Sequence, residues 1–109
     1  MKMDHIALKS NDIKETVSWY QENLSADILY QDETWALVQV NCFKIAFVLE
    51  TMHPPHICFE IDLEKKNELE LEHEEFKHHR DGSAYLYVKD INSNVIEFLY
   101  WPDNKNAKW

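Results

Sequence analysis

The chain has 109 residues, of which 45% are hydrophobic and 28% are charged, a composition typical of one globular domain. Its formal net charge of −9 argues against a nucleic-acid partner, because binding to phosphate needs a basic face. The sequence contains no apolar run of about 18 residues and no apolar signal region behind its first residues. We therefore expect a cytoplasmic protein without a membrane segment.

The first half of the chain predicts a strand, a helix and three further strands. Apolar and polar positions alternate over residues 3–9, which indicates a strand. Asp12 and Glu15 have the spacing of a helix-capping box, and a stripe of apolar residues from Ile13 to Leu24 predicts an amphipathic helix behind it. The three strand-like runs that follow are 27–31, 34–40 and 43–50.

The same order of elements recurs in the second half. Two prolines within residues 51–55 interrupt the first set, since proline removes backbone donors and disfavours helix. A helix is expected over residues 63–75, although its alternating Glu and Leu residues would also suit a strand; its composition and its place in the repeat decide for helix. The expected strands of this half are 56–61, 76–79, 83–90 and 95–101.

The two halves form a weak internal repeat. An offset of 51 residues superposes His5 on His56 and Ala46 on Glu97. Two copies are too few for a solenoid, so two similar strand-rich halves that face each other are the better interpretation.

The repeat brings histidines to equivalent strand positions. Successive strand residues point to opposite faces, so His5 and Ala7 share one face, while Ile6 and Leu8 share the other. We expect the aliphatic face to pack beneath a helix. His56 similarly shares a face with Cys58 and Glu60, and small and polar residues of this kind are typical of a face that lines a cavity.

Glu97 lies inside the most apolar strand of the chain, where a carboxylate is costly unless it is paired or bound to a metal. Taken singly, a strand histidine is more often structural than a ligand, and so is an interior glutamate. Two imidazoles and one carboxylate at corresponding positions, however, suit a three-ligand site for Fe, Mn, Ni or Zn with open positions. We therefore predict that His5, His56 and Glu97 bind one divalent metal.

The ordered set of motifs resembles the vicinal oxygen chelate superfamily, which includes glyoxalases, bleomycin-resistance proteins and extradiol dioxygenases. The resemblance covers residues 3–101. It is carried by Asp4-His5-Ile6-Ala7-Leu8, by Asp12 with Val17-Ser18-Trp19-Tyr20, by Pro54-Pro55-His56-Ile57, and by the closing segment from Tyr85 to Glu97.

The resemblance implies an α+β fold of two βαβββ modules, which form a cup-shaped mixed sheet with helices on its outer face. It implies one domain over 1–109, with a first module at about 1–50, a second at about 54–101 and a tail at 102–109. Members of this size commonly form homodimers, so the site lies either within one chain or between two.

The resemblance also implies roles for individual residues. His5, His56 and Glu97 match the family's metal ligands. Trp35 and Tyr87 match positions that often line the cavity, and Tyr85 shares a face with Tyr87. These three aromatic residues either contact a substrate or simply fill the cup.

Some positions depart from the family pattern. Many glyoxalase I enzymes have a fourth protein ligand on the last strand of the first module, where this chain has Ala46. Fosfomycin-resistance enzymes usually place a hydroxyl residue two positions after the first histidine, where this chain has Ala7. We therefore expect neither an ordinary four-ligand glyoxalase I nor a fosfomycin enzyme.

The implied function is a metal-dependent enzyme that chelates two vicinal oxygens of a small organic substrate to the cation. Glu97 would act either as a permanent ligand or as a base. Lyase, isomerase, transferase and dioxygenase reactions all fit such a site. The alternative is a metal-free protein that binds or sequesters a small molecule, as bleomycin-resistance proteins do, and a third interpretation is an interaction module that uses the acidic second helix.

Two further expectations concern cysteines and histidines. Cys42 and Cys58 each lie in an apolar run and are expected to be reduced core thiols. In the segment around His78, we expect His79 and Arg80 to be residues at the rim of the pocket if the segment has a function at all.

Overall fold

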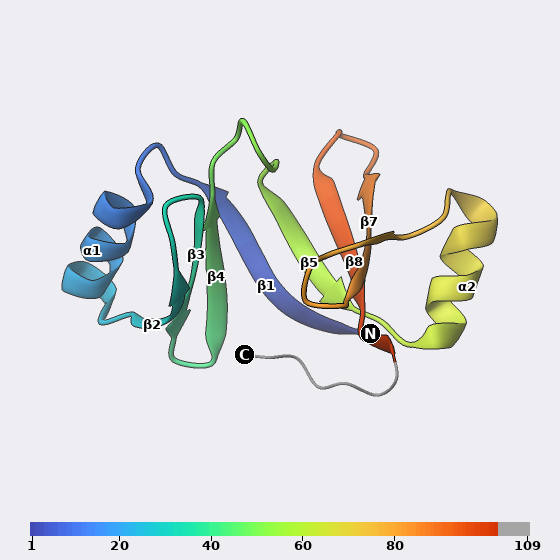
Figure 1. The fold of residues 1–109 in the computed structure, drawn as a ribbon, viewed down its shortest axis with the longest axis horizontal. Coiled ribbons are helices and arrows are strands. Elements are labelled where there is room, and N and C mark those ends of the chain that lie inside the picture. Colours follow the sequence, from blue (N-terminus) through green and yellow to red (C-terminus); the bar gives the residue numbers. More distant parts are fainter. Residues whose placement is uncertain (103–109) are drawn as a thin grey trace. The chain divides into compact units, whose positions relative to one another are not determined.

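The computed structural model describes residues 1–102, and the predicted tail lies outside this range after Pro102. These residues form ten elements in the order βαβββ followed by βαβββ, most of them labelled in Figure 1, so the two predicted modules are confirmed. They are β1 (Lys2–Lys9), α1 (Ile13–Leu24), β2 (Asp27–Gln31), β3 (Trp35–Val40), β4 (Phe43–Val48), β5 (His56–Glu60), α2 (Leu63–Glu72), β6 (Lys77–His78), β7 (Ala84–Lys89) and β8 (Val95–Tyr100). Neither helix of the described range is long and apolar enough to cross a membrane.

Hydrogen bonds join the strands into one eight-stranded mixed sheet in the order β2-β3-β4-β1-β5-β8-β7-β6. Strand β1 runs parallel to β4, with Ala7 opposite Ala46. The neighbours within each hairpin are antiparallel, and Tyr87 of β7 lies opposite Glu97 of β8. The fold class predicted from the sequence is therefore confirmed as α+β with a mixed sheet, while the cup shape and the dimer stay predictions.

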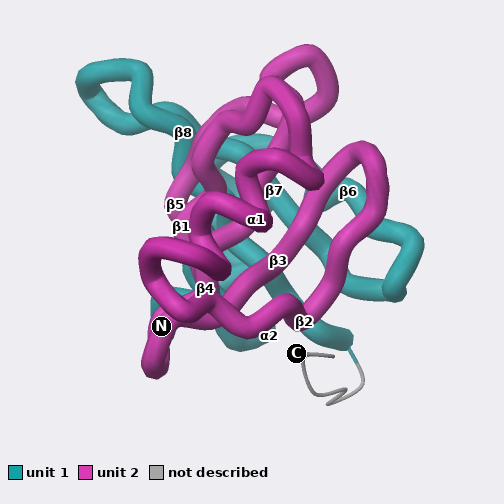
Figure 2. The backbone as a smooth tube through the Cα atoms, turned by 90° about the vertical axis from the view of Figure 1, so that its left-hand side faces the viewer, with its two compact units in different colours: residues 1–4, 58–109 teal, residues 5–57 magenta. Residues whose placement is uncertain are grey.

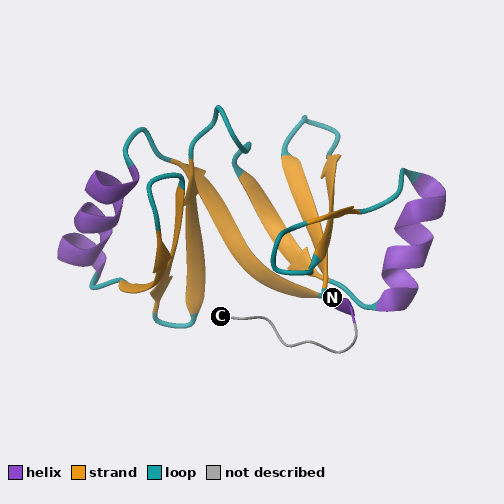
Figure 3. Ribbon diagram, viewed as in Figure 1, coloured by secondary structure: helices purple, strands orange, loops and turns teal. Residues whose placement is uncertain are grey.

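The chain divides into two compact units, coloured separately in Figure 2. We call residues 5–57 the N-terminal unit, and residues 1–4 with 58–109 the C-terminal unit. The division passes through strands β1 and β5. Helix α1 belongs to the N-terminal unit and helix α2 to the C-terminal unit; both are purple in Figure 3, where the strands are orange.

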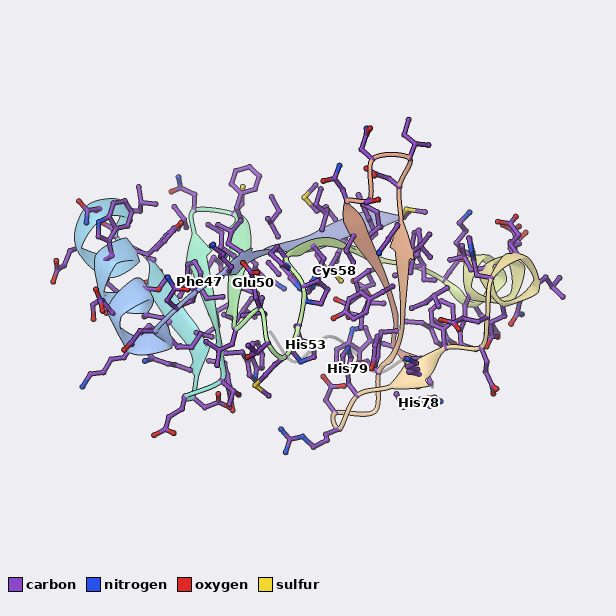
Figure 4. The ribbon with its side chains drawn as sticks, turned by 90° about the horizontal axis from the view of Figure 1, so that it is seen from above. Phe47, Glu50, His53, Cys58, His78 and His79 are labelled. Atoms are coloured by element: carbon purple, nitrogen blue, oxygen red, sulfur yellow. The ribbon has the colours of Figure 1, made fainter. Side chains whose placement is uncertain are left out.

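The N-terminal unit packs α1 against one face of its strands. Asp12 caps the helix, because its side chain accepts a hydrogen bond from the backbone N–H of Glu15 at 3.0 Å. Ile13 and Val17 then point into a core that contains the fully buried Phe47 of β4 (Figure 4). The cap agrees with the sequence prediction, and so does the first part of the apolar stripe, whereas Leu24 at its end is 45% exposed.

The C-terminal unit is built similarly around α2. Asp62 caps this helix by accepting from the N–H of Lys65 at 2.9 Å. Leu69 packs in a core with Phe76 and Leu86, and the carboxylate of Glu70 accepts from the N–H of Phe76. The helix ends at Glu72, three residues earlier than predicted, because the chain must turn back to bury Phe76.

Two expectations about burial were wrong. Ile6 and Leu8 each remain 38% exposed, whereas Ala7 between them is 1% exposed. Ile6 and Leu8 face the same side as the core residues of β4, but α1 packs mainly over β2 and β3. Cys42 is exposed because it lies in the turn between β3 and β4, while Cys58 is buried as expected and both thiols are free.

Candidate functional site

The two equivalent histidines of the repeat lie side by side in the N-terminal unit. The ring centroids of His5 on β1 and His56 on β5 are 5.6 Å apart, and the rings meet edge to face at 70°. His56 is buried and His5 is half-buried. The strand positions that the sequence predicted to be equivalent therefore place two imidazoles within reach of one small ligand.

The orientation of His56 follows from the double proline before it. Its Nδ1 lies 2.7 Å from the carbonyl oxygen of Pro54. A carbonyl oxygen only accepts hydrogen bonds, so Nδ1 carries the proton and a neutral ring has its lone pair on Nε2. This is the arrangement by which proteins commonly orient a metal-binding imidazole.

Glu97 is the buried carboxylate of the C-terminal unit. It is 3% exposed, and its place in β8 puts it on the face of Tyr87, opposite to the face that packs beneath α2. A buried carboxylate needs partners, since the loss of hydration is otherwise costly. Its register in the sheet keeps the carboxylate out of the aliphatic core beneath α2, on the face where polar partners are available.

His79 and Cys58 contact the Glu97 carboxylate. The Nε2 of His79 lies 3.1 Å from Oε2 of Glu97, and a hydrogen bond also links Cys58 to Glu97. Burial raises the pKa of the Cys58 thiol far above its usual range, and the negative charge of Glu97 adds to this effect. The thiol therefore stays protonated at neutral pH and can donate to the carboxylate.

Tyr87 responds to the same environment. Burial raises the pKa of Tyr87 well above its usual range, and the nearby charge of Glu97 raises it further. The phenol therefore keeps its proton over the whole physiological pH range. A neutral phenol beside a carboxylate can serve as a hydrogen-bond donor.

The three aromatic residues predicted to contact a substrate lie in two clusters. In the N-terminal unit, Trp35 stacks on Tyr30 with a centroid distance of 4.5 Å. In the C-terminal unit, Tyr85 stacks on His79 at 3.9 Å and meets Tyr87 edge to face at 5.4 Å. Side chains in such clusters are held rigidly, and their contact with a substrate stays a prediction.

The donor types fit a divalent metal. His5 and His56 of the N-terminal unit each offer an imidazole nitrogen, and Glu97 of the C-terminal unit offers a carboxylate oxygen. Two imidazole nitrogens and one carboxylate suit the transition metals named above better than Mg²⁺ or Ca²⁺, which prefer all-oxygen sites. Ala46 is buried opposite Ala7 and has no donor atom, so the position of a fourth family ligand supplies none.

A hollow of about 390 Å³ lies elsewhere on the C-terminal unit. It is lined by His73, Glu74 and the β7 residues from Leu86 to Lys89. Leu86 and Val88 point toward α2, away from Glu97. Tyr87, one of the residues predicted to contact a substrate, also lines this hollow.

The contact between His79 and Glu97 was not predicted from the sequence, which placed His79 only at the rim of a pocket. The sequence of the hairpin between β6 and β7 nevertheless indicates this contact. Gly82 marks a tight turn, so His79 pairs with Ser83 and falls on the same face as Tyr85 and Glu97. Arg80 lies in this turn and is exposed.

Comparison with known proteins defines the fold. A hypothetical protein, BH1468 from Bacillus halodurans C-125, matches with a TM-score of 0.74 at 15% identity over 97% of this chain and 98% of that chain. Methylmalonyl-CoA epimerase from Mycobacterium tuberculosis matches with a TM-score of 0.72 at 14% identity, over 92% of this chain and 87% of that one.

A glyoxalase/bleomycin resistance protein/dioxygenase superfamily member from Vibrio splendidus 12B01 matches with a TM-score of 0.69 at 9% identity, covering 91% of this chain and 98% of that chain. No family model and no curated protein matches the sequence. The chain thus has the fold of this superfamily over nearly its full length, as its motifs predicted.

Proposed function

We propose that this protein is a metal-dependent enzyme that acts on a small organic molecule with two neighbouring oxygen atoms. His5, His56 and Glu97 would hold the cation. A bound divalent cation acts as a Lewis acid toward oxygens of this kind, stabilising negative charge that develops on them.

The observation that carries the proposal is the donor set. The pair His5 and His56 presents two imidazoles at an edge-to-face distance of 5.6 Å, and the hydrogen bond to Pro54 fixes the tautomer of His56. Glu97 supplies a buried carboxylate, a costly feature that metal coordination would explain. Equivalent positions of the internal repeat supply the two histidines, while Glu97 stands where the first module has Ala46.

The chain's own residues would then divide the work around the substrate. Glu97 either stays on the metal or takes a proton from the substrate. Tyr87 would donate a hydrogen bond, because its raised pKa keeps the phenol neutral. Tyr85 and Trp35 would stack on the substrate and exclude water, as rigid aromatic groups do in ligand sites.

The charge of the chain restricts the substrate. One methylmalonyl-CoA epimerase of this fold is in complex with methylmalonyl-CoA and NH4+. A coenzyme A thioester carries phosphate charges, and a chain with net charge −9 would repel it. We therefore propose a neutral or cationic small substrate for this protein.

Metal binding tests the proposal. Protein purified without chelator should bind close to one equivalent of Zn²⁺, Ni²⁺, Mn²⁺ or Fe²⁺ per chain in calorimetric titrations. His56→Ala and Glu97→Ala should each abolish or strongly weaken that binding, and His73→Ala, a change in an exposed histidine, should leave it intact. Uptake below a tenth of an equivalent by the unaltered protein would contradict the proposal.

A metal-free binding protein is the second candidate, and the stacked aromatic clusters favour it. Trp35 on Tyr30 and Tyr85 on His79 provide flat surfaces for a planar ligand, and the acidic chain would attract a cationic one. Replacing His5, His56 and Glu97 together by alanine separates the candidates. Ligand binding that survives the triple change supports the binding protein.

We also propose a homodimer, as the family resemblance implies. Sedimentation equilibrium at micromolar concentration should then give a mass near twice the 13.1 kDa of one chain. A mass near 13.1 kDa would contradict the dimer and leave a site within one chain.

A further inference from the structure

We propose that His79 is a positioning residue for Glu97: it holds one carboxylate oxygen so that the other is oriented toward the metal. This inference rests on the proposed metal-dependent function and deepens it. It assigns a role to a histidine that is not among the three proposed ligands.

The contact itself has the geometry of a hydrogen bond to a ligand carboxylate. His79 Nε2 lies 3.1 Å from Oε2 of Glu97, and the carboxylate side chain is 4% exposed. An ionised carboxylate only accepts, so the proton of a neutral His79 ring lies on Nε2. The bond joins two residues that are 18 positions apart in the sequence.

The hairpin between β6 and β7 holds the His79 backbone in place. The N–H of His79 donates to the carbonyl of Ser83 at 2.9 Å, and the N–H of Gly82 donates back to the carbonyl of His79 at 3.1 Å. Gly82 has a φ of 92°, a conformation that side chains rarely adopt. The Asp81 carboxylate closes the turn by accepting from the N–H and hydroxyl of Ser83.

The imidazole ring is fixed as well. It stacks on the phenol ring of Tyr85 with a centroid distance of 3.9 Å and an angle of 14° between the planes. Figure 4 labels His79 beside His78, which belongs to the short strand β6. His79 is 31% exposed at its side chain, so the hydrogen bond to Glu97 is partly shielded from water.

A rigid hydrogen-bond donor at one oxygen of Glu97 restricts the rotation of its carboxylate. A glutamate side chain rotates about its terminal bond, and that freedom is lost when it binds a metal. A donor that fixes the rotation before the metal arrives reduces this loss, which is why partners of ligating carboxylates typically contribute 10- to 100-fold in metal affinity. The alternative, that His79 merely compensates a buried charge, predicts an effect on stability without one on metal affinity.

Three variants separate these roles. His79→Phe keeps a ring to stack on Tyr85 but removes the donor. His79→Gln places an amide N–H at about the position of Nε2 and so restores it. His78→Ala is the matched control, because this neighbouring histidine is exposed. Each is titrated with Zn²⁺ by calorimetry, and the unfolding temperature of the metal-free protein is measured in parallel.

We expect His79→Phe to weaken Zn²⁺ binding by about 10- to 100-fold, His79→Gln to recover most of the loss, and His78→Ala to leave affinity unchanged. Wild-type affinity in His79→Phe would overturn the inference and leave the proposed metal site standing. Equal losses in the Phe and Gln variants would also overturn it. A wild-type protein that binds no metal would contradict the inference together with the proposed function.

A spectroscopic measurement covers the case in which a variant fails to fold. Long-range ¹H–¹⁵N spectra of the unaltered protein distinguish the two imidazole tautomers. His79 should be the Nε2–H tautomer both before and after Zn²⁺ is added. The Nδ1–H tautomer in the Zn²⁺-bound protein would overturn the inference.

Discussion

Ala7 and Ala46 lie opposite each other on the parallel strands β1 and β4, at the positions that Cys58 and Glu97 occupy in the second module. In the second module, the equivalent pair is joined by a hydrogen bond from a buried thiol to a buried carboxylate. Two methyl groups in one module thus correspond to a polar pair in the other. At these two repeat positions, only the second module therefore has polar side chains.

Replacing Ala46 by Glu tests this asymmetry. Ala46 is 3% exposed, so we expect Ala46→Glu to destabilise the metal-free protein by about 2–4 kcal/mol through the buried carboxylate. If this is the position of a fourth ligand, Zn²⁺ should raise the unfolding temperature of the variant more than that of the wild type. An equal or smaller increase, measured by differential scanning calorimetry, would exclude Ala46 as a ligand position.

The two thiols should differ sharply in reactivity. Cys42 is exposed, whereas Cys58 is fully buried and its pKa is raised by burial and by Glu97. Because only a thiolate reacts, a disulfide reagent at pH 8 should label one thiol per native chain and a second after denaturation. Cys42→Ser should abolish the labelling of the native chain. Rapid labelling of that variant would contradict the burial of Cys58.

The turn before β3 should make the stability of the folded protein depend on pH in the acidic range. The Tyr30 hydroxyl and the Thr34 and Trp35 amides donate to Asp32, and the hydrogen bond from Tyr30 is the largest contribution that lowers the pKa of Asp32 to about 2. A lowered folded-state pKa stabilises the protein above pH 3.8, and this stabilisation is lost as the pH falls toward 2.

Tyr30→Phe retains a ring beside Trp35 but removes that donor. We expect a loss of about 1–2 kcal/mol in unfolding free energy at pH 7, shrinking between pH 4 and 2. Urea unfolding at several pH values measures the difference. A loss that is constant from pH 7 to 2 would show that the effect does not come from Asp32.

Packing beneath α1 gives a stability test with an internal control. Phe47 is 1% exposed and packs with Val17, while Phe43, on the same strand, is 65% exposed. Phe47→Ala should cost about 3–5 kcal/mol of unfolding free energy because it leaves a cavity, and Phe43→Ala less than about 0.5 kcal/mol. Similar losses in urea denaturation would contradict this core.

Local patterns in the sequence were sufficient for much of the fold. Asp12 caps α1 because the capping spacing is a property of four consecutive residues, and the order of strands followed from alternation and turn residues. The internal repeat supplied the second helix, whose own composition was ambiguous. The pairing of His5 with His56 followed from the same repeat.

The predictions that were wrong or incomplete concern features that tertiary packing determines. α2 ends early because burial of Phe76 outweighs the helix propensity of the acidic residues that follow Glu72. Ile6 and Leu8 are exposed because α1 covers other strands, which no local pattern reveals. His79 reaches Glu97 through a hairpin register and a contact across 18 residues, so a search for single ligand motifs did not find it.

In the proposed metal site, two imidazoles and one carboxylate bind the same cation. The most direct measurement is the X-ray absorption spectrum of the Zn²⁺-loaded protein, compared with that of His56→Ala. We expect two imidazole nitrogens at about 2.0–2.1 Å from the zinc in the wild type, and one after the substitution. A spectrum without imidazole scattering, or one that His56→Ala leaves unchanged, would contradict it.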